Sequence, residues 1–164
     1  MENIYLIFFF ILGLAMGSFL CVVGLRLGRE EDFIKGRSYC DYCHHELKTL
    51  DLIPLFSYLF LKGKCRYCKN KISPLSFFLE LFTGLLYMIA FYSFGFSLEF
   101  IIVLLAISLS MIIFASDLTY LIIPDEVLIF FGIVFFIMEL LLRGPIGAIK
   151  MLFSGIFLFS IMYI

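Results

Sequence analysis

Four cysteines in two close pairs are the residues of this chain whose type and spacing most clearly predict chemistry. Each pair has the form Cys-x2-Cys, Cys40 with Cys43 and Cys65 with Cys68. Two thiolates at this spacing can reach one ion, and two such pairs complete a tetrahedral sulfur site, which is typical of structural zinc. The site would leave no open position for substrate or water. The alternative is a reduced quartet that holds no metal.

The composition predicts a protein that lies in a membrane. Of the 164 residues, 63% are hydrophobic, and the mean hydropathy is +1.12. A water-soluble domain of this size cannot bury so much apolar surface, so lipid must be the solvent for most of the chain. Residues 4–25 carry no charge and follow no basic segment. This run predicts a retained transmembrane helix rather than a cleaved signal peptide.

The positive charges predict the orientation of the chain. Ten of the 12 Lys and Arg residues lie between Arg26 and Lys71, in the polar stretch after the first apolar run. By the positive-inside rule this loop is cytoplasmic and the N-terminus lies outside. Cytosolic thiols stay reduced, which favours metal over disulfides for the loop cysteines. Because the basic cluster lies between two apolar spans, we expect no nucleic-acid partner.

Four further apolar runs predict helices at residues 74–96, 98–116, 127–142 and 146–164. Gly95 predicts a tight turn, Pro124 a helix start, and Gly144 with Pro145 a break. We therefore expect an all-α, polytopic transmembrane bundle of about five helices with a cytoplasmic zinc loop. Its parts are a first transmembrane helix (1–27), the cysteine loop (28–73) and a membrane domain (74–164).

The last apolar run is short for a transmembrane helix. From residue 151 it would be roughly 21 Å long, against a hydrocarbon core of about 30 Å. It also ends on Met-Tyr-Ile without a polar anchor. We expect that the chain is truncated at its C-terminal end.

Among the ionisable residues, Asp117 is the one whose position in the sequence most clearly indicates a function. It ends a long apolar helix, where the helix dipole and partial burial disfavour a carboxylate charge, and ionisable groups at membrane depth are costly. Counting crossings from the N-terminus puts it on the side of the cysteine loop. The alternative is an anchor among the lipid headgroups. Asp125 and Glu126 follow Pro124, where acids suit a helix start.

Several different short motifs follow one another over nearly the whole chain. They are Gly17-Ser18-Phe19-Leu20, with Arg26 close behind; the two cysteine pairs, with Asp51-Leu52-Ile53-Pro54 between them; Ile72-Ser73-Pro74, then Glu80-Leu81 and Thr83-Gly84; and Asp117, eight residues before the Asp125 of Ile123-Pro124-Asp125. Together they resemble the motifs of the type IV prepilin peptidases, which are integral membrane aspartic peptidases.

The resemblance implies an enzymatic activity, a location in the cell, and roles for particular residues. The family's members cleave the short basic leader from prepilins and pseudopilins at the cytoplasmic membrane face, in pilus assembly, type II secretion and competence. Many then methylate the new N-terminus with S-adenosylmethionine. For this chain the resemblance implies a multi-pass protein of the cytoplasmic (inner) membrane, a catalytic Asp117, zinc on the four cysteines, and methyltransferase-associated roles for Gly17 and Glu80. The partners would be leader peptides and membrane lipid.

Two of these residues have simpler explanations. Gly17, like Ser18, is small enough to let two helices approach closely. Glu80 could be paired with an Arg or Lys of the loop. His44 and His45 could ligate metal, but four thiolates already suffice, so we expect both in a solvated loop.

Two departures from the family pattern bear on activity. Aspartic catalysis needs two carboxylates that share a proton, and the family's second aspartate lies in a Gly-x-Gly-Asp motif that this chain lacks. Asp125 is the alternative second acid, although its place at a helix start has a structural reason. Cys21 stands where the family usually has Asn. A thiol cannot supply the amide's paired donor and acceptor, which bears on methylation more than on proteolysis.

Two functions from different classes therefore remain open. In the first, the chain belongs to a prepilin peptidase and is inactive alone, because the second aspartate is missing. In the second, it is a non-catalytic, zinc-stabilised membrane scaffold that binds prepilin leaders or an assembly partner. An ion transporter is disfavoured, because Glu80 and Glu139 are too sparse to line a conduction path.

Overall fold

The computed structural model describes residues 2–29, 31 and 37–162. Over this part of the chain the elements are α1 (Glu2–Gly28), η1 (Thr49–Asp51), α2 (Phe56–Phe60), α3 (Leu75–Phe94), α4 (Leu98–Tyr120) and α5 (Asp125–Met162). Four of them, α1, α3, α4 and α5, are long and apolar enough to cross a membrane. The all-α, multi-pass architecture expected from the sequence is confirmed. The chain forms two compact units, Met1–Pro124 and Asp125–Ile164.

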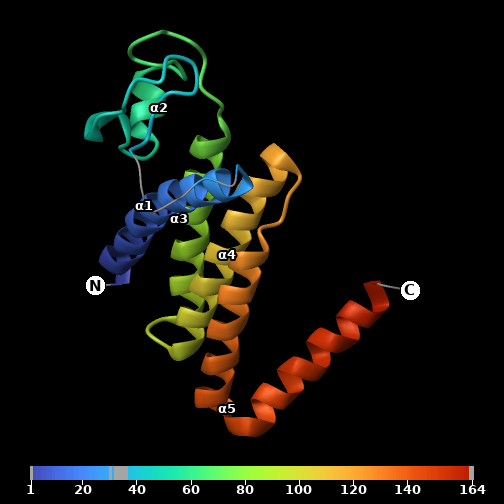
Figure 1. Cartoon of the computed structure of the whole chain (residues 1–164). Coiled ribbons are helices and arrows are strands. Elements are labelled where there is room, and N and C mark those ends of the chain that lie inside the picture. The colour runs from blue at the N-terminus through green and yellow to red at the C-terminus, as the bar shows by residue number, and fades with distance from the viewer. Residues whose placement is uncertain (1, 30, 32–36, 163–164) are drawn as a thin grey trace. The chain divides into compact units, whose positions relative to one another are not determined.

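In the first unit, α1 packs against both α3 and α4, and these two helices also contact each other (Figure 1). Glycines on α1 make the approach very close. A Cβ on Gly13 would lie 2.7 Å from the Cα of Gly84, and one on Gly17 would lie 2.8 Å from the Cα of Glu80. Small residues at such spacing let helix backbones touch in lipid, where packing rather than the hydrophobic effect holds helices together.

Aromatic residues fill the contact at the end of the unit farthest from the cysteine loop. Phe9 of α1 stacks on Phe91 of α3, with ring centroids 4.6 Å apart, and meets Phe100 of α4 edge-on at 4.9 Å. A buried polar pair also joins α3 and α4, because the hydroxyls of Tyr87 and Ser108 lie 2.8 Å apart. Each polar group finds its partner inside the bundle, as a low-dielectric environment requires.

The helix ends follow local sequence signals. Gly95 takes a φ of 55° and ends α3, as predicted, and the Ser97 side chain then caps α4 by accepting from the N–H of Phe100 at 3.1 Å. α4 continues to Tyr120, one turn beyond its expected end at residue 116. It stops at Leu121, whose φ of 56° lets its N–H donate to the carbonyl of Asp117.

The second unit is α5, which begins at Asp125 directly after Pro124. Its helical conformation is interrupted at Gly144, where φ is 67° and ψ is −168°, and Pro145 follows. The predicted break between two apolar helical segments is therefore confirmed. Glu139 and Arg143 form an ion pair at 3.6 Å, the helical i, i+4 pair that their spacing indicates.

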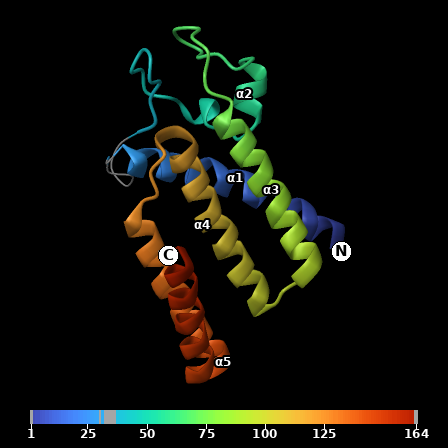
Figure 2. The same cartoon turned by 90° about the vertical axis from the view of Figure 1, so that its right-hand side faces the viewer.

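The cysteine loop lies at the end of the first unit where α1 and α4 end and α3 begins (Figures 1 and 2). Two contacts connect its short helix α2 to α3. The N–H of Leu55 donates to the carboxylate of Glu80 at 2.8 Å, and the rings of Tyr58 and Phe77 lie 5.3 Å apart. The loop is thus packed on the helix ends rather than suspended from them.

Candidate functional site

Both cysteine pairs form the same turn. In each, the N–H of the first cysteine donates to the carbonyl five residues later, at 3.1 Å for Cys40 and 2.9 Å for Cys65. The residue four positions after each first cysteine takes a positive φ, 54° at His44 and 61° at Lys69. This repeated backbone turn points the two sulfur atoms of each pair in one direction.

The two turns bring the four sulfur atoms of Cys40, Cys43, Cys65 and Cys68 within 4.8 Å of one another. The Sγ atoms of Cys40 and Cys68 are 3.9 Å apart, and all four cysteines are free thiols. A tetrahedral zinc ion with bonds of about 2.3 Å needs sulfur atoms roughly 3.8 Å apart. The quartet could therefore hold one zinc ion, and the four-cysteine cluster expected from the sequence is present.

The electrostatics of the quartet favour a cation. Burial raises the pKa of Cys65, but the backbone N–H groups of Cys68 and Tyr67 and the neighbouring thiols outweigh it and bring this pKa to about 7. At Cys68 the backbone N–H of Asn70 lowers the pKa, but burial and the other thiols raise it to about 11. Near neutral pH the Cys65 thiol is therefore already partly ionised, and a bound divalent ion would favour the thiolate form of its ligands.

The two histidines of the loop lie outside the sulfur cluster. The ring of His45 packs on Tyr67, with centroids 3.7 Å apart, and that of His44 lies 5.8 Å from Tyr39. Among the described residues, the cluster that could hold a metal consists of cysteines alone.

A buried carboxylate supports the loop from within. The side chain of Asp51 is 2% exposed and lies 2.7 Å from Nε of Arg66. Its Oδ2 also accepts from the N–H of Lys48 at 3.2 Å and from the Tyr67 hydroxyl at 3.4 Å. Asp51 thereby joins η1 to the second cysteine turn. The sequence contained Asp51 only as part of a motif, without a sign of this role.

Glu80 is buried at the contact between the loop, α1 and α3. Its carboxylate accepts from the N–H of Leu55 and from the Ser18 hydroxyl. Among the described residues, the structure records no ion pair between Glu80 and an Arg or Lys of the loop. Gly17 lies against the same turn of α3, where a side chain would clash with the backbone of Glu80. The two residues are thus brought together by helix packing.

A cavity of about 230 Å³ lies between the loop and the ends of α1 and α3. Charged groups of both signs line it, among them Glu80, Asp51, Arg26 and Arg29. Cys21 does not line it; the buried Cys21 thiol instead contacts the Ser76 hydroxyl at 3.5 Å. The cavity is smaller than the roughly 300–1,000 Å³ of most small-molecule sites.

Asp117 lies in the last turn of α4, at the same end of the unit as the cysteine loop. Its side chain is exposed, so the partial burial expected from the sequence is not provided by the described residues. Among those residues no hydrogen bond or ion pair reaches its carboxylate. Asp125 is the first residue of α5, in the second compact unit.

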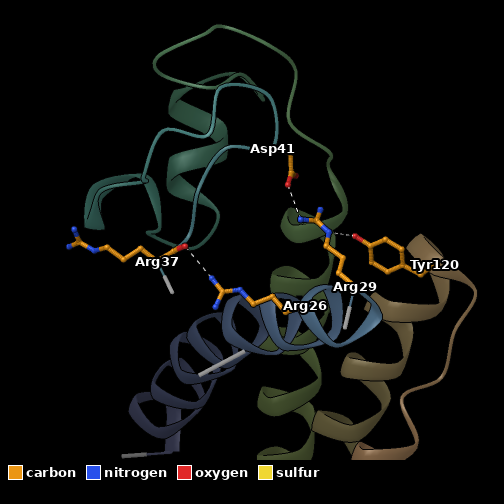
Figure 3. Close-up of polar contacts among 5 residues, drawn as sticks. All are labelled: Arg26, Arg29, Arg37, Asp41 and Tyr120. Carbon is orange, nitrogen blue, oxygen red and sulfur yellow. Dashed lines mark hydrogen bonds and ion pairs between the residues drawn. The ribbon is translucent and has the colours of Figure 1, made fainter. Parts of the chain in front are cut away.

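Arg29 connects the loop to the helix that carries Asp117 (Figure 3). Its Nε donates to the hydroxyl of Tyr120, the last residue of α4, and its guanidinium lies 5.9 Å from the centre of that ring. From its other side Arg29 pairs with Asp41 of the first cysteine turn at 3.0 Å. No sequence signal distinguished Arg29 from the other basic residues of the loop.

The fold and this site define a class, a multi-pass membrane protein whose helices carry a loop of four clustered cysteines at one end. The model of the Bacterial Peptidase A24 N-terminal domain matches residues 11–94, which include the whole cysteine loop. The chain therefore belongs to the type IV prepilin peptidase family.

Relatives agree with this assignment. The chain is similar to prepilin leader peptidase/N-methyltransferases of Bacillus subtilis (40% identity over 74% of this chain and 49% of the relative), Myxococcus xanthus (37%, over 74% and 36%) and Klebsiella pneumoniae (36%, over 72% and 54%). It thus spans about half the length of the first and third of these relatives. No solved structure matches the chain.

Proposed function

We propose that the chain carries one catalytic aspartate of a membrane endopeptidase that removes leader peptides from prepilins or pseudopilins. Membership of the family supports this function, as do the names of the relatives. The observation that carries it is Asp117, a solvent-accessible carboxylate in the last turn of an apolar helix, on the side of the cysteine loop. We propose the cytoplasmic face of the inner membrane for that side, because the basic residues gather there.

Peptide hydrolysis by aspartates requires two carboxylates that share a proton. One activates the attacking water, and the other polarises the scissile carbonyl. Asp117 is free to do either, since no basic side chain among the described residues of the first unit pairs with its carboxylate. For the second acid we favour the family's Gly-x-Gly-Asp motif over Asp125, because an acid in the first turn of α5 already has a structural role there.

In this proposal zinc is structural. Four thiolates would saturate the ion, so it would hold the two cysteine turns together and leave the reaction to other groups. Through Asp41 and Arg29 the first turn reaches Tyr120, three residues from Asp117. The loop would thereby help to fix the end of α4.

Methylation of the new N-terminus is the second activity that the relatives' names suggest. The cavity beside Glu80 is below the size of most small-molecule sites. It does not enclose a whole S-adenosylmethionine in this conformation, so we derive no step through that molecule. Gly17 and Glu80 support the walls of this region by packing and hydrogen bonding, which is the role we propose for them in methyl transfer.

A cleavage assay tests the peptidase. This chain would be joined to the part of the Bacillus subtilis relative that it does not match, and incubated with a prepilin in detergent. We expect cleavage by the chimera, and a loss of at least about a hundredfold on Asp117→Asn, since a missing acid–base group costs roughly 10²–10⁴ in rate. Asp125→Asn is the matched control and should stay active.

Two results would contradict the proposal. One is a normal rate with Asp117→Asn. The other is a chimera that binds prepilin and zinc but does not cleave, which would favour the non-catalytic scaffold. If the chain cleaves prepilin without the added part, the second acid lies within it, and Asp125 is the first residue to test.

A further inference from the structure

The short helix α2 in the cysteine loop exposes an apolar face. Phe56, Leu59 and Phe60 recur at the i, i+3, i+4 spacing of one helix face and are 57%, 58% and 82% exposed. Leu52 and Ile53, which lie four and three residues before the start of α2, are each 40% exposed. A loop surrounded by water normally presents polar residues here, so a contiguous apolar surface of this kind indicates an interaction site.

The segment that carries this surface is basic. Residues 52–79 contain five basic and no acidic residues. Arg66 is paired with Asp51. The other four are lysines with exposed side chains, and the structure records no ion pair for any of them in the part of the chain that it describes: Lys62, Lys64, Lys69 and Lys71. Exposed lysines in the same segment as exposed phenylalanines match an anionic, partly apolar surface.

The surface lies where a membrane helix begins. The opposite side of α2 is fixed to the first turns of α3 through the bond from Leu55 to Glu80 and the contact of Tyr58 with Phe77. On α3 itself, the next exposed aromatic residues are Phe78 and Phe82, which belong to a predicted membrane span. The apolar face of α2 is therefore held at the level at which α3 leaves the lipid.

We propose that α2 and residues 52–53 dock on the headgroup layer of anionic lipids. The apolar side chains would enter the boundary with the acyl chains, and the four lysines would lie among the phosphates. Short amphipathic segments with this combination bind in the interface plane, and each basic residue near an anionic surface adds to the attraction. The loop would then be held at the bilayer surface by lipid as well as by α3.

A fluorescence experiment on the whole chain tests this proposal. The chain contains no tryptophan, so Phe60→Trp introduces a single reporter on the proposed docking face. The variant is placed in nanodiscs of phosphatidylcholine, with or without phosphatidylglycerol, made from plain or brominated lipid. We expect emission at shorter wavelength and several-fold stronger quenching by brominated lipid when phosphatidylglycerol is present. Retained zinc shows that the variant loop is folded.

Two matched variants separate the effect of membrane depth from the effect of the lysine charges. Phe82→Trp reports a membrane-buried position and should be quenched equally in both lipid mixtures. Phe60→Trp combined with glutamine at all four lysines should lose the dependence on phosphatidylglycerol. If brominated lipid does not quench the tryptophan at position 60, the proposal is overturned. This holds whether water or another protein surface surrounds that tryptophan. Equal quenching with and without anionic lipid also overturns it.

Discussion

The guanidinium of Arg29 donates to the hydroxyl of Tyr120, although 91 positions separate the two residues. Arg29 lies just beyond α1, and Tyr120 is the last residue of α4. The backbone of α1 lies close against the same side chain, because a Cβ on Gly28 would clash with the Tyr120 ring. Since Arg29 also binds Asp41, this one side chain joins α1, α4 and the first cysteine turn (Figure 3).

A double-mutant cycle on Arg29→Lys and Tyr120→Phe should reveal coupling between the two residues. Lysine keeps the charge but cannot reproduce the fixed geometry of the guanidinium. The Arg29 side chain is 32% exposed, so solvent weakens the interaction, and we expect about 1 kcal/mol of coupling or less. Thermal unfolding of the four proteins in detergent measures it.

The loop offers a matched pair for this cycle. Arg37 and Glu46 form an ion pair at 3.1 Å, but their side chains are 77% and 63% exposed. Coupling in the cycle of Arg37→Lys and Glu46→Gln should therefore be near zero. If the effects of Arg29→Lys and Tyr120→Phe simply add, the junction does not stabilise the unit.

Gly17→Ala should destabilise the first unit, because the new methyl group would lie 2.8 Å from the Cα of Glu80 and 2.9 Å from Thr83. Overpacking of this kind costs about 1–3 kcal/mol. Gly132→Ala is the control, since no atom lies within 4 Å of its added Cβ, and alanine favours a helix by up to about 1 kcal/mol. Unfolding midpoints in detergent compare the two; equal midpoints would contradict the close packing of α1 on α3.

Glu80→Ala should release the loop from α3, whereas Glu80→Gln should leave it attached. The alanine variant leaves the N–H of Leu55 without its acceptor, at a cost of about 1–3 kcal/mol, but glutamine retains a carbonyl oxygen there. Limited proteolysis of the loop, followed by mass spectrometry, measures the difference. Equal cleavage rates in the two variants would show that the bond does not hold the loop.

The transmembrane helices could be predicted because lipid imposes long apolar runs, and Gly95 and Gly144 ended them through their own backbone freedom. The extra turn of α4 could not be predicted from the sequence. Its residues Asp117 to Tyr120 are mostly polar, and the helix ends only at the left-handed conformation of Leu121, an apolar residue with no preference for that conformation.

The candidate site likewise has a part that the sequence predicts and a part that it does not. The clustering of the four cysteines follows from their spacing along the chain, so it was predictable. The partner of Glu80 is a backbone N–H, and that of Arg29 is a tyrosine in another helix. Neither leaves a pattern in the sequence, because both depend on how the loop packs against the helix ends. The role of Asp117 stays a prediction from motif and position.

Cys65→Ser should abolish binding of one equivalent of zinc, because Cys65 is the most deeply buried ligand, 1% exposed, and three thiolates leave the tetrahedral site incomplete. Cys21→Ser is the matched control: this thiol is equally buried, 2% exposed, but lies within α1 and outside the sulfur cluster. It should retain the zinc. Metal analysis of both purified variants measures the difference.

Removing the metal should act on the loop and spare the membrane helices. Structural zinc contributes its binding free energy to folding, on the order of 10 kcal/mol in small zinc modules, whereas α1, α3 and α4 are held by their own packing. Adding a chelator should therefore increase hydrogen exchange between residues 37 and 73 and leave α3 and α4 protected. The same region should exchange faster in Cys65→Ser. Unchanged exchange in the loop after complete zinc removal would show that the hydrogen bonds of Asp51 and Glu80, rather than the ion, hold it in place.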